Sequence, residues 1–298
     1  MQGLLLINKP EGLTSFGVVA KIKWLLHTKR VGHTGTLDPM ATGVLPVLLG
    51  RDTVLCSHLL DADKEYVATV KLGVTTDTLD KTGAVLSKTE VKVSAEQLKE
   101  ALRGFLGKQQ QIPPMYSALK KDGVRLYDLA REGKKIEREP REIEIFELEL
   151  LDFSGDEFKI RVVCSKGTYI RSLADDIGKK LGTGAMLTAL ERTKTAGFKI
   201  EECVDLDSLT PENTASFLKS SENAVLNYPL LSVSEKQAQR FANGGELALE
   251  RLHFKTKPEN GEIYRVKNGE KFLGLGEVDF SKSALKIKCL TYHPSDDR

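Results

Sequence analysis

The sequence lacks the segments that would carry it into or across a membrane. Its 298 residues contain no run of 18 uncharged apolar residues, which excludes an ordinary transmembrane helix. No basic region precedes the short apolar run at residues 4–7, so a signal peptide is not expected at the N-terminus. We therefore expect a cytoplasmic protein.

Residues that bind metals or form disulfides are few and unpatterned. The four cysteines show no C-x-x-C pair, and the five histidines form no H-E-x-x-H motif. We expect free thiols and no metal site. P-loop and nucleophile-elbow motifs are also missing, and the G-x-G at residues 182–184 follows an expected helix rather than a strand. The sequence predicts no bound cofactor.

The nearly balanced charge, with 44 basic and 42 acidic side chains, conceals a partition along the chain. Residues 1–60, 101–140 and 161–200 carry an excess of basic side chains. Residues 142–160 and 201–230 carry an excess of acidic ones. A basic face for a polyanion is one interpretation, and ordinary solvated surface is the other.

Hydrophobic periodicity predicts both strands and helices, without a regular strand–helix–strand alternation. This favours an α+β fold with a mixed, largely antiparallel central sheet flanked by helices and loops. The expected strands are 3–8, 66–72, 142–151, 158–164, 263–267, 271–280 and 284–290. The expected helices follow Thr14 or Ser15 and cover 94–105, 122–132, 168–181 and 234–243, with a helical connection at 201–230. We expect a large domain at 1–228, with an insertion at about 106–141, and a small β-rich module at 229–298.

One segment shows neither helix nor strand periodicity, and its composition favours a functional interpretation. Residues 30–43 contain three glycines and an Asp-Pro step, and ordered loops of this length are usually functional. Pro39 favours an extended backbone at Asp38, so that carboxylate could be aimed at a substrate. The alternative is an Asx-turn in which Asp38 only caps the loop.

Two further residues are candidates for the same site. Arg171 follows Ile170 at the start of an expected helix and points off its apolar face, where a guanidinium could clamp a carboxylate. The alternative is a surface arginine or a structural ion pair. Tyr66 begins an expected strand and could equally be a core residue, because Ala68, Val70 and Leu72 share its face.

Taken together, the motifs resemble the bacterial tRNA pseudouridine synthase B family, the TruB-type enzymes that modify uridine 55 in the TΨC loop. The resemblance covers nearly the whole chain. The two most specific stretches are G-H-T-G-T-L-D-P at 32–39 and Q-I-P-P-M-Y-S-A-L-K at 111–120. The others are N-K-P at 8–10, D-K-E-Y at 63–66, T-D-T at 76–78 and G-T-Y-I-R at 167–171.

The resemblance implies the pseudouridine synthase fold, a PUA-like C-terminal module and a role for each candidate residue. Asp38 is then the catalytic carboxylate, Arg171 its partner, and Tyr66 the residue that stacks on the flipped base. The remaining implied site residues are Tyr169 and Leu190 in the pocket, His33 in the RNA-facing loop, Lys9 as a structural or phosphate-facing residue, and Lys120 in the RNA-gripping insertion. One departure is Val54, where the family commonly has a lysine, and Arg51 could compensate for it.

The implied function is isomerisation of uridine to pseudouridine in the T-arm of tRNA, without cofactor, metal or obligatory protein partner, by a monomer. Two alternatives stay open. One is a non-catalytic tRNA-binding or tRNA-folding protein on the same fold. The other is a guide-RNA-dependent relative, which the bacterial-type insertion and the short C-terminal module disfavour.

Overall fold

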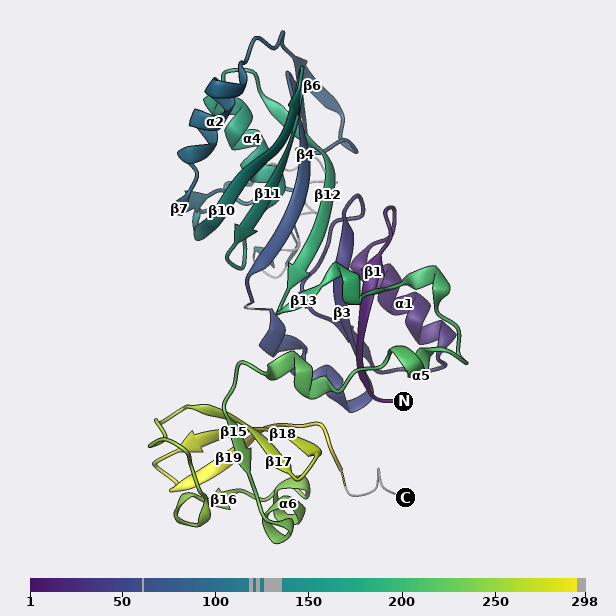
Figure 1. The fold of residues 1–298 in the computed structure, drawn as a ribbon, viewed down its shortest axis with the longest axis vertical. Helices are drawn as coiled ribbons and strands as arrows, with labels where there is room; N and C mark the ends of the chain where they lie inside the picture. Colours follow the sequence, from purple (N-terminus) through teal and green to yellow (C-terminus); the bar gives the residue numbers. More distant parts are fainter. Residues whose placement is uncertain (61, 118–119, 122–123, 126–135, 294–298) are drawn as a thin grey trace.

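The computed structural model describes residues 1–60, 62–117, 120–121, 124–125 and 136–293, and shows two large sheets with helices around them (Figure 1), together with two small hairpins. In the described part, the larger sheet has ten strands in the order β14-β1-β3-β12-β4-β11-β10-β7, with β13 on β12 and β2 on β3. Its strands are β1 (Gly3–Lys9), β2 (Val31–His33), β3 (Thr42–Leu49), β4 (Lys64–Leu72), β7 (Gly107–Gln111), β10 (Arg141–Ser154), β11 (Glu157–Cys164), β12 (Ala185–Thr195), β13 (Phe198–Lys199) and β14 (Val204–Asp205).

The neighbouring strands of this sheet are antiparallel except where β14 pairs with β1 and β12 pairs with β3. The expected α+β class with a mixed, largely antiparallel sheet is confirmed. The helices are α1 (Ser15–Leu25), α2 (Ala95–Arg103), α4 (Ile170–Lys180), α5 (Thr214–Phe217) and α6 (Glu235–Ala242), with 3-10 turns η1 (Gly50–Leu59), η2 (Ile200–Glu202), η3 (Leu206–Ser208), η4 (Ser221–Val225) and η5 (Leu249–Arg251). No helix in the described ranges is long and apolar enough to cross a membrane.

Several expected boundaries need correction. The helix α4 begins two residues after Thr168, with Tyr169 at its N-cap, and the 30–43 loop contains the short strand β2. The 201–230 connection contains α5 and the short 3-10 turns η2, η3 and η4, and it also includes the two-residue strand β14, which the sequence did not predict. Most of the helix expected at 122–132 lies outside the described residues, and residues 124–125 form β9 (Val124–Arg125), which pairs with β8 (Lys120–Lys121).

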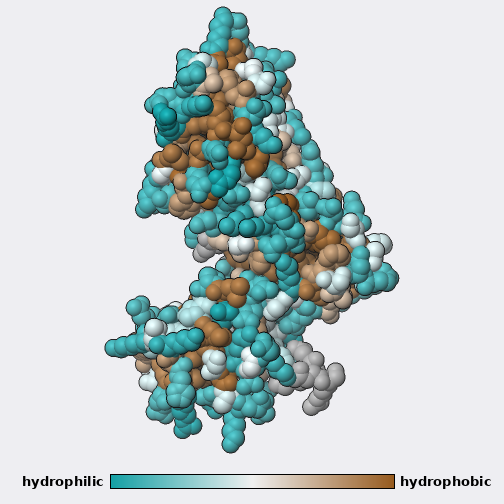
Figure 2. Space-filling view, viewed as in Figure 1, coloured by the Kyte–Doolittle hydropathy of each residue, from teal (hydrophilic) through white to brown (hydrophobic). Residues whose placement is uncertain are grey.

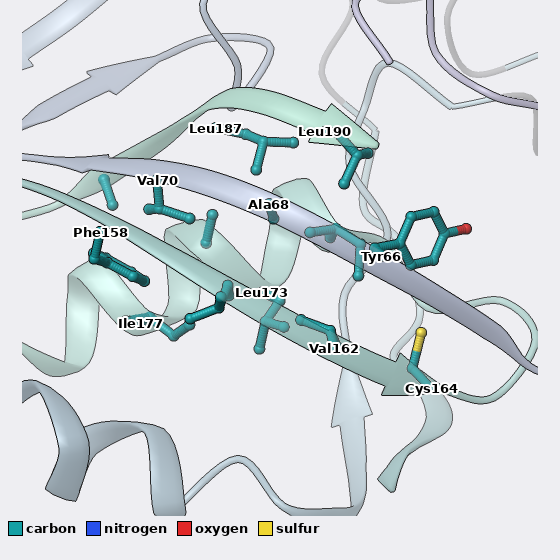
Figure 3. Close-up of a cluster of buried hydrophobic side chains, with 14 of the residues drawn as sticks. Tyr66, Ala68, Val70, Phe158, Val162, Cys164, Leu173, Ile177, Leu187 and Leu190 are labelled. Carbon is teal, nitrogen blue, oxygen red and sulfur yellow. The ribbon is translucent and has the colours of Figure 1, made fainter. Parts of the chain in front are cut away.

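The main core lies between the larger sheet and two helices. In Figure 1, α2 and α4 lie together against one face of the strands β4, β11 and β10. Alternate residues of β4 and β11 point into this core because side chains alternate between the two faces of a strand. Figure 3 shows this cluster with Ile177 and Leu173 of α4 below Val70 and Ala68 of β4, and Val162 of β11 beside Leu173.

A second core lies under α1, at the other end of the larger sheet. Thr14 caps α1 by accepting a hydrogen bond from Gly17 N at 2.9 Å, as the sequence predicted. The buried face of α1 packs with β1 and β3 through Val18, Val19 and Ile22. This packing fixes the two chain segments, residues 9–14 and 34–41, that lead to the candidate site.

The C-terminal module is a five-stranded sheet with its own core. It contains β15 (Leu230–Ser232), β16 (Leu247–Ala248), β17 (Ile263–Asn268), β18 (Lys271–Asp279) and β19 (Ala284–Leu290), in the order β15-β17-β18-β19-β16. Its far side also joins a shared apolar cluster, in which Leu275 of β18 packs with Leu4, Leu55 and Val225. The module is therefore attached to the larger domain by contacts between buried side chains as well as by the polypeptide connection.

The small hairpin of β5 (Val74–Thr76) and β6 (Val85–Lys88) projects at the top of Figure 1.

Figure 2 shows the same side of the molecule, with a hollow above the C-terminal sheet. A groove of about 1150 Å³ is lined there by residues that include Glu65 and Arg161. Both side chains alternate away from the α4 side of the sheet, so this groove lies on the face opposite Tyr66 and Val162.

Candidate active site

The loop between β2 and β3 holds Asp38 at the α4 side of the sheet. Ser15 Oγ accepts a hydrogen bond from Leu37 N at 2.8 Å and donates one to Leu37 O at 3.2 Å. Gly12 N donates to Pro39 O at 2.8 Å. Leu37 and Met40 are buried on either side, while the side chain of Asp38 remains 33% exposed. The loop is thus anchored from both sides and presents its carboxylate to solvent.

Arg171 lies against that carboxylate. Its Nη2 donates to Asp38 Oδ1 at 3.1 Å, and its Nε lies 2.8 Å from Oδ2, although the Nε–H is not aimed well enough to count as a hydrogen bond. The guanidinium is only 4% exposed. The residues are 133 positions apart in sequence, so the fold brings together the two candidates that the motifs predicted.

The remaining donors of Arg171 fix the guanidinium plane. Nη1 donates to Thr78 O at 3.0 Å and Nη2 to Tyr116 O at 2.7 Å. Asp80 Oδ2 lies 3.7 Å from Nη1, and Asp80 is itself buried and held through Oδ1 by Thr78 and Thr82. Arg171 therefore connects the Asp38 loop to the turn at residues 76–84 and to the segment 111–117 through its hydrogen bonds.

Burial and the charge of Arg171 shift the pKa of Asp38 in opposite directions. Burial raises the pKa of Asp38 above its ordinary value of 3.8. Arg171 lowers this pKa through charge and hydrogen bonding, the nearby Asp80 carboxylate raises it, and Lys9 lowers it weakly. The net direction is upward. Asp38 therefore combines a partly desolvated carboxylate with a rigid cationic partner, which keeps it oriented.

The 111–117 segment is bound to the start of α4. Gln111 donates through Nε2 to Tyr169 O at 3.1 Å and accepts from Tyr169 N at 2.8 Å. Ser172 Oγ donates to Ile112 O at 3.0 Å. Tyr169 is half-buried at the N-cap of α4, and burial raises the pKa of its phenol. The two specific motifs of the sequence thus meet at the Asp38–Arg171 pair.

Tyr66 and Leu190 lie at the edge of the main core beside the loop. Tyr66 is 7% exposed, and Figure 3 shows its ring beyond Ala68 and Leu190 with the hydroxyl pointing away from the aliphatic side chains. Burial raises the pKa of Tyr66. The ring can therefore form one wall of a base pocket while its hydroxyl faces polar surroundings.

Arg192 is a site residue that the sequence analysis missed. It is fully buried on β12 and pairs across the sheet with Tyr66 of β4. Its Nε donates to Val44 O at 2.8 Å and its Nη2 donates to Gly35 O at 3.0 Å, and its positive charge lowers the pKa of Tyr66 against the larger effect of burial. Arg192 thus holds the chain on both sides of Asp38, at Gly35 and at Val44.

Lys9 is also fully buried, which favours its structural role over a phosphate contact. Its Nζ donates to Leu13 O at 2.6 Å, Pro10 O at 2.8 Å and Pro39 O at 3.4 Å. Burial lowers the pKa of Lys9 to about 8, against the smaller raising effect of Asp38. Lys9 therefore fixes the Asp38 loop from the side of β1, opposite Arg192.

The other predicted residues lie at the margins of the site. His33 ends β2, its Nδ1 is buried without a partner, and burial lowers its pKa. Val54 is 45% exposed on η1, where the usual family lysine would reach solvent. Lys120 lies on β8, and its side chain is outside the described part of the structure. Among the described residues, no group of three metal-ligating side chains gathers in one place.

Comparison with known families agrees with this architecture. Residues 23–170 match the model described as "TruB family pseudouridylate synthase (N terminal domain)". Residues 171–230 match the "tRNA pseudouridylate synthase B C-terminal domain". The fold and the site define a pseudouridylate synthase, which is an isomerase.

Relatives identify the family. The tRNA pseudouridine synthase B of Francisella philomiragia is 47% identical over 287 residues, which are 95% of this chain and 93% of the relative. That of Clostridium tetani is 45% identical, covering 96% of this chain and 98% of the relative. The chain belongs to the TruB family of pseudouridylate synthases, as the motifs predicted.

Solved structures give the same fold. A chain from a Cbf5-Nop10-Gar1 complex is similar with a TM-score of 0.75 and 27% identity, covering 98% of this chain and 86% of that one. A chain from an H/ACA RNP bound to a substrate RNA containing 2'-deoxyuridine has a TM-score of 0.73 and 25% identity, with 97% and 85% covered. These similarities confirm the overall fold and leave the role of each site residue as a prediction.

Proposed function

We propose that this enzyme isomerises uridine 55 in the TΨC loop of tRNA to pseudouridine, with Asp38 as the catalytic carboxylate. The observation that carries the proposal is the Asp38–Arg171 contact, in which a one-third-exposed carboxylate is held by an almost fully buried guanidinium. The family and the names of its relatives supply the reaction class. The geometry of the pair supports Asp38 as the catalytic residue.

The chemistry requires little besides this pair. The N1–C1′ bond of uridine breaks, the base turns, and C5 bonds to C1′. C5 then loses its proton and N1 gains one, so the product is an isomer of the substrate and no redox change occurs. A carboxylate beside the ribose can attack C1′ or stabilise developing positive charge there, as carboxylates do in glycoside hydrolysis. A route through a glycal, formed by loss of the C2′ proton, stays open, and the Tyr66 hydroxyl could accept that proton.

The neighbouring residues suit an extruded base. Tyr66 offers an aromatic ring at the edge of the pocket, and base–aromatic stacking contributes about 1–3 kcal/mol per base. Leu190 and Tyr169 lie beside the same loop and form further walls. Arg171 aims the carboxylate, while Lys9 and Arg192 hold the loop that carries it.

The RNA is proposed to be gripped by parts outside the pocket. Residues 106–141 would contact the T-arm, with Lys120 among the phosphate-binding residues. We assign catalysis to residues 1–228 and added grip on tRNA to the PUA-like module at 229–298. We further propose a monomer that needs no protein partner, working in the cytoplasm, where its tRNA substrate is found.

One experiment separates this function from the two alternatives. Purified protein is incubated with an unmodified tRNA transcript, and the positions at which pseudouridine forms are then mapped. A transcript with cytidine at position 55 is the matched control. Pseudouridine at position 55 without added RNA or protein supports the proposal. Binding without product indicates the tRNA-folding alternative, and product only with a guide RNA indicates the guide-dependent one.

A further inference from the structure

The outer face of α1 carries an exposed aromatic stripe. Phe16 is 70% exposed and Trp24 is 73% exposed. Ala20 lies between them at the same helical spacing and is also exposed. Residues four positions apart lie one above another on a helix, so the three form a continuous strip that faces away from the sheet.

The opposite face of α1 already supplies its packing. Val18, Val19 and Ile22 are buried in the cluster under α1, so the stripe adds nothing to the core. A surface helix normally opposes its apolar face with polar side chains. Contiguous exposed apolar side chains, bordered by polar ones, indicate a contact site for another molecule.

The charge around the stripe identifies the kind of molecule. No Asp or Glu occurs between Glu11 and Asp38. Lys21 is paired with Asp207 of the neighbouring acidic connection. Of the basic side chains in this interval, Lys23, Lys29 and Arg30 have no carboxylate within 4 Å in the described part of the structure. The stripe is therefore bordered by uncompensated positive charge.

The stripe also begins next to the catalytic loop. Ser15, the residue immediately before Phe16, makes both hydrogen bonds to Leu37. A polyanion whose reacting base reaches Asp38 can therefore continue along α1 without leaving the protein surface. Aromatic rings beside lysine and arginine are the side chains that hold unpaired nucleotides and their phosphates.

We infer that the outer face of α1 is a second RNA-binding surface, which holds nucleotides of the substrate RNA outside the catalytic pocket. Phe16 and Trp24 contact bases or riboses, while Lys23 and Arg30 contact phosphates. The inference rests on the proposed function for the identity of the RNA. It adds a surface that acts on binding and leaves the chemical step to the Asp38 site.

Trp24 is the only tryptophan of the chain, so its fluorescence reports on this face alone. The test titrates the unmodified tRNA transcript into the wild-type protein and measures quenching of Trp24 by acrylamide. We expect the bound RNA to lower the quenching constant at least twofold. Unchanged quenching at saturating RNA, in the same sample that forms pseudouridine, would overturn the inference while leaving the proposed function intact.

A pair of variants measures the contribution to affinity. Phe16→Ser with Trp24→Ser should weaken tRNA binding about tenfold, with the single-turnover rate at saturating RNA unchanged. The matched control, Val85→Ser with Leu86→Ser, removes exposed apolar side chains from β6 and should change affinity less than twofold.

Charge variants give an independent reading. Lys23→Gln with Arg30→Gln should reduce the slope of log affinity against log salt by about 0.7–0.9 per lost phosphate contact. Equal affinities for the stripe variant and its control would contradict the inference. So would a doubling of mass in light scattering that protects Trp24 without RNA, because a second copy of the chain would then cover the face.

Discussion

Arg192 and Tyr66 are paired across β12 and β4, and Arg192 donates to Gly35 O in the Asp38 loop and to Val44 O in β3. The side chain of Arg192 is fully buried. Burial raises the pKa of the Tyr66 phenol, and the positive charge of Arg192 lowers it. A single buried cation thus joins the strand that carries Tyr66 to the loop that carries Asp38.

Arg192→Met should lower both stability and catalysis. The change leaves Gly35 O and Val44 O without their donor, and unsatisfied buried groups cost about 1–3 kcal/mol each. Urea unfolding should show a loss of at least about 2 kcal/mol. Arg161→Met, on a partly exposed ion-paired residue, is the control and should cost less than about 1 kcal/mol. Equal midpoints for the two variants would contradict this role.

Arg171→Lys should impair the chemical step far more than RNA binding. Lysine keeps the charge but cannot contact Asp38, Thr78 O and Tyr116 O with one planar group. Misplacement of a reacting group by about 1 Å can cost on the order of 100-fold in rate. Single-turnover pseudouridine formation should fall by that much, whereas Arg103→Lys, on an exposed ion pair, should leave it unchanged. Wild-type turnover by Arg171→Lys would refute the clamp.

The rate should depend on the ionisation of Asp38. Its pKa is raised above 3.8, and the carboxylate is the reactive form, so activity should be full above that pKa and fall as pH decreases through it. Arg171→Gln removes the cation that lowers this pKa, so the acid limb should move to higher pH. Circular dichroism at each pH checks that the fold persists. A limb that moves to lower pH would contradict the pairing.

The sequence was most informative where the pattern is local. The capping box of Ser94 and Gln97 predicted α2, and the alternation at 142–151 predicted β10. The strand β12 was missed because its register shifts near Leu187 and Arg192 break the period of two. Arg192 was overlooked for the same reason.

The site was predicted through motifs rather than through periodicity. Asp38 and Arg171 were proposed together only because the motifs resemble a family, since they are 133 residues apart. Asp80 and Gln111 act through contacts with Arg171 and Tyr169, which depend on how α4 lies against two distant segments. The shared cluster around Leu275 likewise arises from the docking of two sheets, which no local pattern encodes.

Deletion of residues 229–298 should leave a catalytic core that is less stable than the full chain. The deletion uncovers Leu4 and Leu55, which pack with Leu275, and each fully buried leucine contributes about 1.5–3 kcal/mol. The urea concentration at the midpoint of unfolding should fall. Turnover of a T-arm hairpin, measured at urea concentrations below that midpoint, should barely change. A folded truncated protein that cannot modify the hairpin would place the module within the catalytic unit.

The most direct test of the account is Asp38→Asn. Asparagine keeps the size of the side chain but loses the charge that the reaction requires, and it can still accept from Arg171. Filter binding and pseudouridine mapping would be carried out on the same tRNA transcript. We predict affinity within about threefold of the wild type, as expected for a residue that acts on the transition state, and no pseudouridine at position 55 under single-turnover conditions. Formation of pseudouridine by the variant, at a rate above that explained by wild-type contamination, would contradict the assignment of Asp38 as the catalytic residue.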